Sequence, residues 1–226
     1  MVVQFLDSDD FWLAPFRKIT NKGVKKNIGK FPSIKMGRNI WYESILESDL
    51  IDLLEFDPDV IRYKEQPFRI KYIYEGKRRS YIPDIFAQRK NKLQAIEVKP
   101  EEKASTKSNR LRYQVISSIL EFYGIEFVVA TEKMIRIQPL LENVQLCWGY
   151  GRTLVHPLHE TYSREYLASR QGVSINELVT ALANYGVTLQ VVYALIYRGV
   201  LATNLHLPVS PRSVVTFMGR TVDVSL

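Results

Sequence analysis

The stretch that decides the fold runs from Pro83 to Lys99 and reads PDIFAQRKNKLQAIEVK. Two apolar runs, rich in Ile, Phe and Val, flank the polar residues 89–92, which include a turn-tolerant Asn. This pattern predicts an antiparallel hairpin with strands over residues 81–88 and 93–99.

The predicted hairpin brings charged side chains together on one face. If the turn is centred on residues 90 and 91, Asp84 falls directly opposite Glu97, and directly opposed Cβ atoms lie about 5 Å apart. Lys99 points to the same face because it is two residues from Glu97. The opposite face carries apolar side chains and is expected to contact a core; these are Ile85, Ile96 and Val98.

Two carboxylates at this separation repel each other unless they share a cation. Mg²⁺ prefers oxygen ligands and suits a site of one or two carboxylates beside a substrate phosphate. The ammonium group of Lys99 would then assist deprotonation of a water or stabilise charge on the phosphate. The alternative is a solvated hairpin face, because Pro-Asp begins many strands and Glu-x-Lys is a common surface alternation.

The composition is that of a folded protein with a sizeable core. The chain has 226 residues, of which 46% are hydrophobic and 12% aromatic. No apolar run approaches the roughly 18 residues of a membrane span, and the N-terminus is acidic where a signal peptide would be basic. We therefore expect a cytoplasmic protein without a membrane partner. The single cysteine, Cys147, excludes an intrachain disulfide and is expected in the core.

A block of positive charge occupies residues 17–38, which hold eight lysines and arginines and no acid. Such a block favours a polyanion, although a solvated leader explains the charge equally well. Beside a phosphate-directed metal site, nucleic acid becomes the better interpretation. The predicted DNA contacts are Lys22, Lys25, Lys26, Lys30, Lys35 and Arg38.

Lysine usage and hydrophobic spacing indicate how the chain is organised. Lysine is frequent up to Lys133 and absent after it, which predicts a domain change between residues 134 and 160. We divide the chain into a basic N-terminal segment (1–40), a central domain (41–150) and a C-terminal domain (151–226). The central domain reads as a helix over 41–56, a strand over 60–74, the hairpin, a helix from Ser105 or Thr106 to Phe122, and a strand over 125–131.

This order resembles the restriction-endonuclease-like fold, whose signature is PD-(D/E)xK, and it implies an α/β core with a mixed sheet flanked by helices. Three further runs narrow the resemblance: SILESD at 44–49, LEFDPDV at 54–60 and YKEQP at 63–67. They are similar to the N-terminal nuclease domain of TnsA, the endonuclease subunit of heteromeric transposases. The resemblance covers residues 30 to 150 well and the remainder loosely.

The resemblance also implies roles for particular residues. The metal-proximal acid of the first helix corresponds to Glu47, with Glu43 one turn earlier as the rival. The Pro-Asp acid is Asp84, the strand acid is Glu97 and the lysine is Lys99. The implied metal is Mg²⁺, with Mn²⁺ as an alternative, held by Glu47, Asp84, Glu97 and Val98. Gln66 at the edge of the site and Gln114 as a DNA contact are further candidates.

The C-terminal third reads as a small helix-turn-helix unit with a wing. Helices are predicted over 175–184 and 189–197, followed by strand-like runs over 200–207 and 213–218. The second helix carries almost no charge, whereas a helix that reads a major groove normally brings Arg, Lys, Asn or Gln. We therefore expect a winged-helix-like protein-docking domain, in agreement with TnsA relatives, whose C-terminal domains engage an AAA+ transposition ATPase.

Together these features predict a metal-dependent DNA endonuclease that hydrolyses the non-transferred strand at the 5′ ends of a transposon. The expected partners are double-stranded DNA at the transposon ends, a DDE-type transposase that cuts the other strand, and the AAA+ ATPase. Two alternatives remain at this point: a stand-alone restriction or junction-resolving nuclease of the same fold, and an inactive DNA-binding assembly protein.

Overall fold

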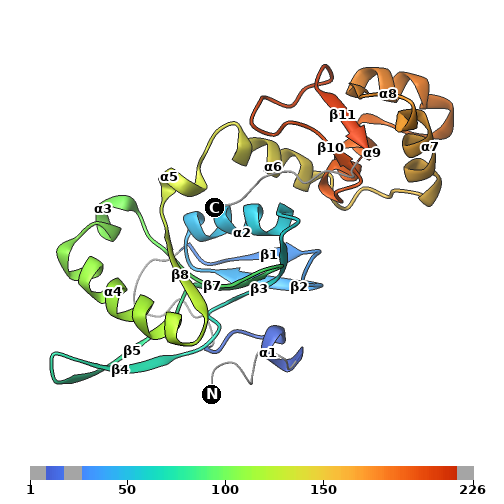
Figure 1. Ribbon diagram of the computed structural model, residues 1–226. Helices are drawn as coiled ribbons and strands as arrows, with labels where there is room; N and C mark the ends of the chain where they lie inside the picture. Colours follow the sequence, from blue (N-terminus) through green and yellow to red (C-terminus); the bar gives the residue numbers. More distant parts are fainter. Residues whose placement is uncertain (1–8, 18–26, 218–226) are drawn as a thin grey trace. The chain divides into compact units, whose positions relative to one another are not determined.

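The computed structural model describes residues 9–17 and 27–217. The chain divides into two compact units (Figure 1). The first comprises residues up to 55 and 59–135, and the second comprises residues 56–58 and 136 onward. Of the helices that the described residues form, none has the length and apolar character needed to cross a bilayer.

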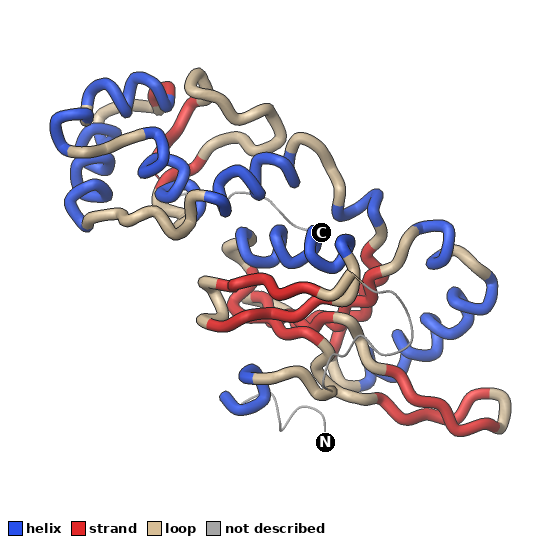
Figure 2. The backbone as a smooth tube through the Cα atoms, turned by 180° about the vertical axis from the view of Figure 1, so that it is seen from behind, coloured by secondary structure: helices blue, strands red, loops and turns tan. Residues whose placement is uncertain are grey.

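A mixed four-stranded sheet forms the centre of the first unit. Its order is β3 (Val60–Glu65), β6 (Ile85–Arg89), β7 (Leu93–Val98) and β8 (Ile125–Ala130). Strands β7 and β8 are parallel, and the other neighbours are antiparallel. Helices flank this sheet, with α2 (Ile45–Phe56) on one side and α4 (Lys107–Phe122) on the other (Figures 1 and 2). The predicted fold class is confirmed, because this arrangement is consistent with a restriction-endonuclease-like core.

The β6–β7 hairpin has the register predicted from the sequence. Ile85 pairs with Ile96 and Phe86 pairs with Ala95, so that the next position outward holds Asp84 and Glu97. The side chains expected to face a core are buried, with 1% exposure for Ile85 and Ile96 and 5% for Val98. The hairpin is therefore covered on this face, and its charged end is fixed by the same pairing.

The N-terminal residues contribute directly to the core. Helix α1 (Asp9–Leu13) brings Trp12 against Phe86, with ring centroids 5.7 Å apart. Lys64 donates to the Phe11 carbonyl and Arg38 to the Trp12 carbonyl, so one buried and one partly buried strand residue hold α1 in place. The core cluster consists of Trp12, Ile70, Tyr81, Phe86, Ala95, Ile116, Leu120 and Ile125. A hairpin of β1 (Gly29–Ser33) and β2 (Arg38–Tyr42) follows α1, so the described part of the predicted basic segment has regular structure.

The single strand predicted over 60–74 is two strands. Gln66 has a φ of 41° and Pro67 follows it, so the chain leaves the central sheet after β3. Strand β4 (Ile70–Tyr74) then pairs with β5 (Lys77–Tyr81) in a separate two-stranded ribbon. Glu75 and Gly76 have φ values of 51° and 70°, as a two-residue type I′ hairpin turn requires.

The second unit contains the helices and short strands predicted for the C-terminal third. The first unit also contains the short helices α3 (Glu101–Ala104) and α5 (Glu132–Ile135). The helices of the second unit are α6 (Leu140–Gly149), α7 (Pro157–Ala168), α8 (Ile175–Ala181), η2 (Ala183–Tyr185) and α9 (Leu189–Tyr197). Strand β11 (Val214–Phe217) pairs with β10 (Leu201–Ala202) and β9 (Val173–Ser174). Residues 191–196 of α9 are buried, which explains why this helix carries almost no charge.

The compact units divide between residues 135 and 136, inside the range of 134 to 160 drawn from lysine usage and ahead of the limit of 150 given to the central domain. Helix α6 belongs to the second unit because it packs against α9. Lysine frequency reflects the composition of the solvent-exposed surface, whereas the division into compact units depends on which helices and strands pack against each other. The winged-helix character of the C-terminal part stays a prediction.

Candidate active site

Asp84 is held at the entry to β6 by hydrogen bonds across the hairpin. The Val98 N–H donates to its Oδ2 at 2.8 Å, and the Gln66 N–H donates to its main-chain carbonyl at 2.8 Å. The side chain is half-buried. These bonds hold one carboxylate oxygen at the end of β7, as the predicted pairing requires.

Glu97 is buried, with 3% exposure, and is surrounded by donors. The Tyr81 hydroxyl donates to its Oε2 at 2.6 Å, and the Tyr113 hydroxyl lies 3.4 Å from its Oε1. Lys99 Nζ and Arg112 Nη2 lie 3.2 and 3.7 Å from the same Oε1. Two hydroxyl groups and two cations therefore surround this buried carboxylate, as a buried polar group requires.

Sequence reasoning missed three of these four side chains. Tyr81 precedes the Pro-Asp pair by two residues and could have been placed beside it from the chain direction alone. Arg112 and Tyr113 come from α4, and their contact with Glu97 depends on how that helix packs on the sheet. No local pattern reports such a contact.

Lys99 carries its charge at neutral pH in this environment. Burial opposes the charged ammonium, but the carboxylates of Glu97 and Asp84 outweigh burial and raise the pKa of Lys99. The side chain is 35% exposed, so the ammonium is accessible from solvent. Of the two roles predicted for Lys99, charge stabilisation fits this protonation state better than acceptance of a proton.

Hydrogen bonds with Glu43 and Ser44 hold Glu47 at the start of α2. The Glu47 N–H donates to Ser44 Oγ at 3.2 Å, while Glu47 accepts from the Ser44 hydroxyl at 3.0 Å and from the Glu43 N–H at 2.8 Å. Burial nevertheless raises the pKa of Glu47, and Lys99 acts in the opposite direction. The rival acid, Glu43, forms an ion pair with Arg17 at 2.9 Å. The electrostatic interaction with Lys99 favours Glu47 over Glu43.

The carboxylates of Glu47, Asp84 and Glu97 are close enough to interact electrostatically. Burial is the largest cause that raises the pKa of Asp84 well above its ordinary value, and the charges of Glu97 and Glu47 add to it. The Val98 N–H and Lys99 act against this shift but do not cancel it. Carboxylates from α2, from the start of β6 and from the end of β7 therefore crowd together, and a cation would relieve their repulsion.

The oxygen-only donor set suits a hard divalent ion such as Mg²⁺. Across residues 9–17 and 27–217, no three His, Cys, Asp or Glu side chains are already spaced as metal ligands. The hydrogen bonds of Glu47 explain in part why the three acids are not spaced as metal ligands, because these bonds direct both Glu47 oxygens towards the start of α2. Glu47 would have to turn away from these bonds to join the site.

Gln66 bonds to Asp84 through its backbone, whereas Gln114 is linked to the acids only through its neighbour Tyr113. Gln66 is 4% exposed, has a positive φ, and its buried Oε1 accepts no hydrogen bond from the described residues. A strained backbone and an unsatisfied acceptor are features that cluster at functional sites. Gln114 is exposed on α4 and lines a hollow between α4 and β8 that also includes Tyr113, the neighbour of Glu97.

The predicted DNA-contact residues fall into different environments. Lys22, Lys25 and Lys26 lie outside the described residues. Lys30 is exposed, with its Nζ 4.4 Å from the centre of the Trp41 ring. Lys35 donates to the Leu54 carbonyl at 2.8 Å, in the last turn of α2, where a cation is favourable.

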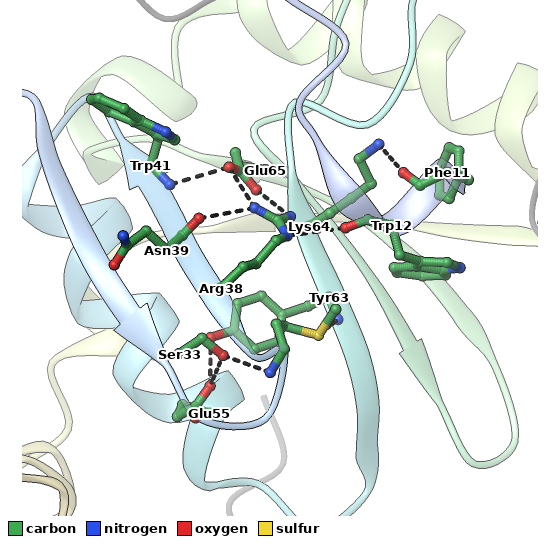
Figure 3. Close-up of polar contacts among 11 residues, drawn as sticks. Phe11, Trp12, Ser33, Arg38, Asn39, Trp41, Glu55, Tyr63, Lys64 and Glu65 are labelled. Atoms are coloured by element: carbon green, nitrogen blue, oxygen red, sulfur yellow. Dashed lines mark hydrogen bonds and ion pairs between the residues drawn. The ribbon is translucent and has the colours of Figure 1, made fainter. Parts of the chain in front are cut away.

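Arg38 is engaged inside the protein (Figure 3). Its two terminal nitrogens donate to the two oxygens of Glu65 at 2.9 and 2.7 Å, and the side chains of Arg38 and Glu65 are 16% and 2% exposed. The Trp41 N–H also donates to Glu65 at 3.2 Å. This bidentate pair joins β2 to β3 and favours a structural role for Arg38 over the predicted DNA contact.

Part of the chain matches a known protein family. Residues 57–132 match the family model described as TnsA-like endonuclease N terminal. The matched segment contains Asp84, Glu97 and Lys99, and Glu47 precedes it. No curated protein matches the chain.

Proposed function

We propose that this chain cuts DNA as the nuclease subunit of a heteromeric transposase. The proposal follows from residues 57–132, which match the TnsA-like endonuclease N-terminal domain and so support a TnsA-family endonuclease. In this proposal it hydrolyses the non-transferred strand at the 5′ ends of the transposon. The observation that carries the proposal is the meeting of Asp84, Glu97 and Lys99 at one end of the β6–β7 hairpin, within the matched segment.

The proposed cofactor is Mg²⁺, with Mn²⁺ as the alternative. Asp84, Glu97 and the Val98 backbone would hold the ion, with Glu47 joining them from α2. The fit rests on crowded carboxylates: burial, and after it the charges of Glu97 and Glu47, raise the pKa of Asp84. When bound, the ion would supply a Lewis acid for the phosphate and lower the pKa of a bound water.

The protein side chains have separate tasks in this proposal. Lys99, as an ammonium, donates a hydrogen bond to the scissile phosphate and stabilises the negative charge that builds on it. Tyr81 and Tyr113 orient Glu97 through their hydroxyl groups. Arg112 lies on the same side of Glu97 and offers a second cation for phosphate oxygens.

The proposed partners are transposon-end DNA, a DDE-type transposase that cuts the other strand, and an AAA+ ATPase. We assign ATPase docking to the second unit. Helix α9 is buried and uncharged, so a role for this unit in reading a major groove through that helix has no support. Large apolar side chains on its surface, such as Leu154 with 89% exposure, suit contact with a protein.

The test is strand-specific cleavage by the chain reconstituted with its transposase and ATPase. Asp84→Ala and Lys99→Ala are expected to abolish cleavage at the 5′ ends while the transposase still cuts the other strand and both variants remain folded. Lys103→Ala, which changes a lysine outside the site, is the matched control and should cut normally. Ordinary cleavage by both site variants would refute the assignment, and cleavage by the purified native chain alone would favour a stand-alone nuclease.

A further inference from the structure

The β4–β5 ribbon, residues 69–80, concentrates positive charge. Its sequence RIKYIYEGKRRS contains five cations and one acid. Lys71, Lys77, Arg78 and Arg79 are exposed, and Ile73 between them is 73% exposed. The DNA contacts predicted from the sequence lie within residues 22–38 and at Gln114, outside this ribbon.

The ribbon cations are available to a ligand. Within the described part of the chain, Lys71, Lys77, Arg78 and Arg79 form no ion pair with a carboxylate. Cross-strand pairing sets Tyr72 beside Arg79 and Tyr74 beside Lys77, and both pairs lie on the same face of the ribbon. A hollow over the ribbon is lined by Arg69, Lys71, Arg78 and Arg79. Exposed cations that alternate with tyrosines suit a nucleic acid, whose phosphates attract the cations and whose bases can contact the aromatic rings.

The base of the ribbon is joined to the candidate active site. Tyr81, the last residue of β5, donates to Glu97 at 2.6 Å, and Asp84 follows three residues later. Strands rise about 3.3 Å per residue, so Lys77 lies about 13 Å along the ribbon from Tyr81. With one base pair per about 3.4 Å of duplex, this length corresponds to about four base pairs. Figures 1 and 2 show the ribbon projecting from the sheet of the first unit.

We propose that the β4–β5 ribbon binds the phosphate backbone of duplex DNA beside the nick, within about four base pairs of the scissile phosphate. A two-stranded ribbon is narrow enough to enter a major groove. Lysine and arginine on both of its faces would contact phosphates along the groove walls, so binding is independent of base sequence. The inference rests on the proposed nuclease function, because that function supplies the DNA.

The test is equilibrium binding of the full chain to a labelled 30-base-pair duplex of unrelated sequence in EDTA, followed by fluorescence anisotropy over a salt series. The ribbon variant is the triple substitution Lys77→Gln, Arg78→Gln and Arg79→Gln. Three lost phosphate contacts should lower the slope of log affinity against log salt by about 2 to 3 and weaken binding at least about tenfold near 0.1 M salt. The single variant Arg78→Gln should lower the slope by about 1.

The matched control removes the same charge from the second unit through Arg152→Gln, Arg170→Gln and Arg212→Gln, all at exposed positions. It should keep the native slope. An equal loss in both triple variants, a ribbon variant with native slope and affinity, or a native chain without salt-dependent binding would each overturn the inference. Unchanged DNA binding with lost co-elution of the transposase would also overturn it, in favour of an acidic protein surface.

The binding assay and the strand-cleavage assay together separate this inference from the proposed function. Asp84→Ala leaves the ribbon intact and should bind DNA as the native chain does while it fails to cut. If Asp84→Ala cuts normally, the nuclease assignment fails although the ribbon result stands. If the ribbon variant binds and cuts normally while Asp84→Ala fails to cut, the ribbon inference fails and the nuclease assignment stands.

Discussion

Replacement of Asp84 by Asn should stabilise the metal-free protein while it removes a residue of the proposed active site. Asn has nearly the same shape as Asp, and its carbonyl oxygen can still accept the hydrogen bond from the Val98 N–H. What changes is the charge. In the native protein the Asp84 carboxylate faces burial and the charges of Glu97 and Glu47, and these raise its pKa.

The magnitude follows from the hairpin register. Opposed Cβ atoms lie about 5 Å apart, and two unit charges at that distance repel by about 3 kcal/mol at an effective dielectric constant of about 20. Loss of the charge also weakens the Val98 hydrogen bond, by about 1 kcal/mol. The net gain for Asp84→Asn is about 2 kcal/mol, which corresponds to a rise in Tm of about 4 to 8 °C for a chain of this size.

The gain should depend on pH in a defined direction. The pKa of Asp84 is raised in the folded protein, so folding takes up a proton between the unfolded pKa, about 3.9, and the folded pKa. Native stability is therefore lost as pH rises through this window, whereas Asn does not titrate. The variant and the native chain should have similar stability near pH 4 and diverge as pH increases.

The assay is thermal unfolding in EDTA at a series of pH values, with Asp59→Asn as the control for the loss of one carboxylate away from the three crowded acids. A difference that grows with pH for Asp84→Asn alone supports the crowded-acid description. A variant that is no more stable than the native chain at high pH would contradict it.

Three other changes have outcomes that the structure determines. Arg38→Gln should cost about 3 to 5 kcal/mol in urea unfolding, because Glu65 would keep a buried charge without its partner; a cost below 1 kcal/mol with weakened DNA binding would restore the DNA role. Tyr81→Phe should cost about 1 to 3 kcal/mol because Glu97 loses a buried donor, and unchanged unfolding would argue against that bond. Burial raises the pKa of Cys147 to about 12, so a thiol reagent at pH 8 should react only after unfolding, and rapid reaction of the folded chain would contradict the burial.

Local pattern was enough to predict the hairpin and the group of acids on it. The register of β6 and β7 follows from a short turn and from alternation over a few residues, and a shift by one residue would have moved Ile96 to the wrong face. The relation among Asp84, Glu97 and Lys99 follows from that register alone. The family interpretation also came from short runs of residues, and the match over residues 57–132 confirms it.

Features that depend on distant contacts could not be predicted in this way. Arg38 reads as a surface cation until Glu65, 27 residues away, is placed against it. Strand β4 was predicted as the end of a strand over 60–74 because Ile and Tyr continue past Pro67, whereas the positive φ of Gln66 and the proline after it separate β4 from β3. Trp12 joins the core from a segment that was judged by its charge.

The most direct test of the central claim is titration of Mn²⁺ or Mg²⁺ into the metal-free chain, followed by calorimetry, with native protein and Asp84→Asn compared under identical conditions. We expect the native chain to bind the ion and the variant to lose that binding while it stays folded. Equal binding by both chains, or no binding by the native chain, would contradict a divalent-cation site at the end of the β6–β7 hairpin.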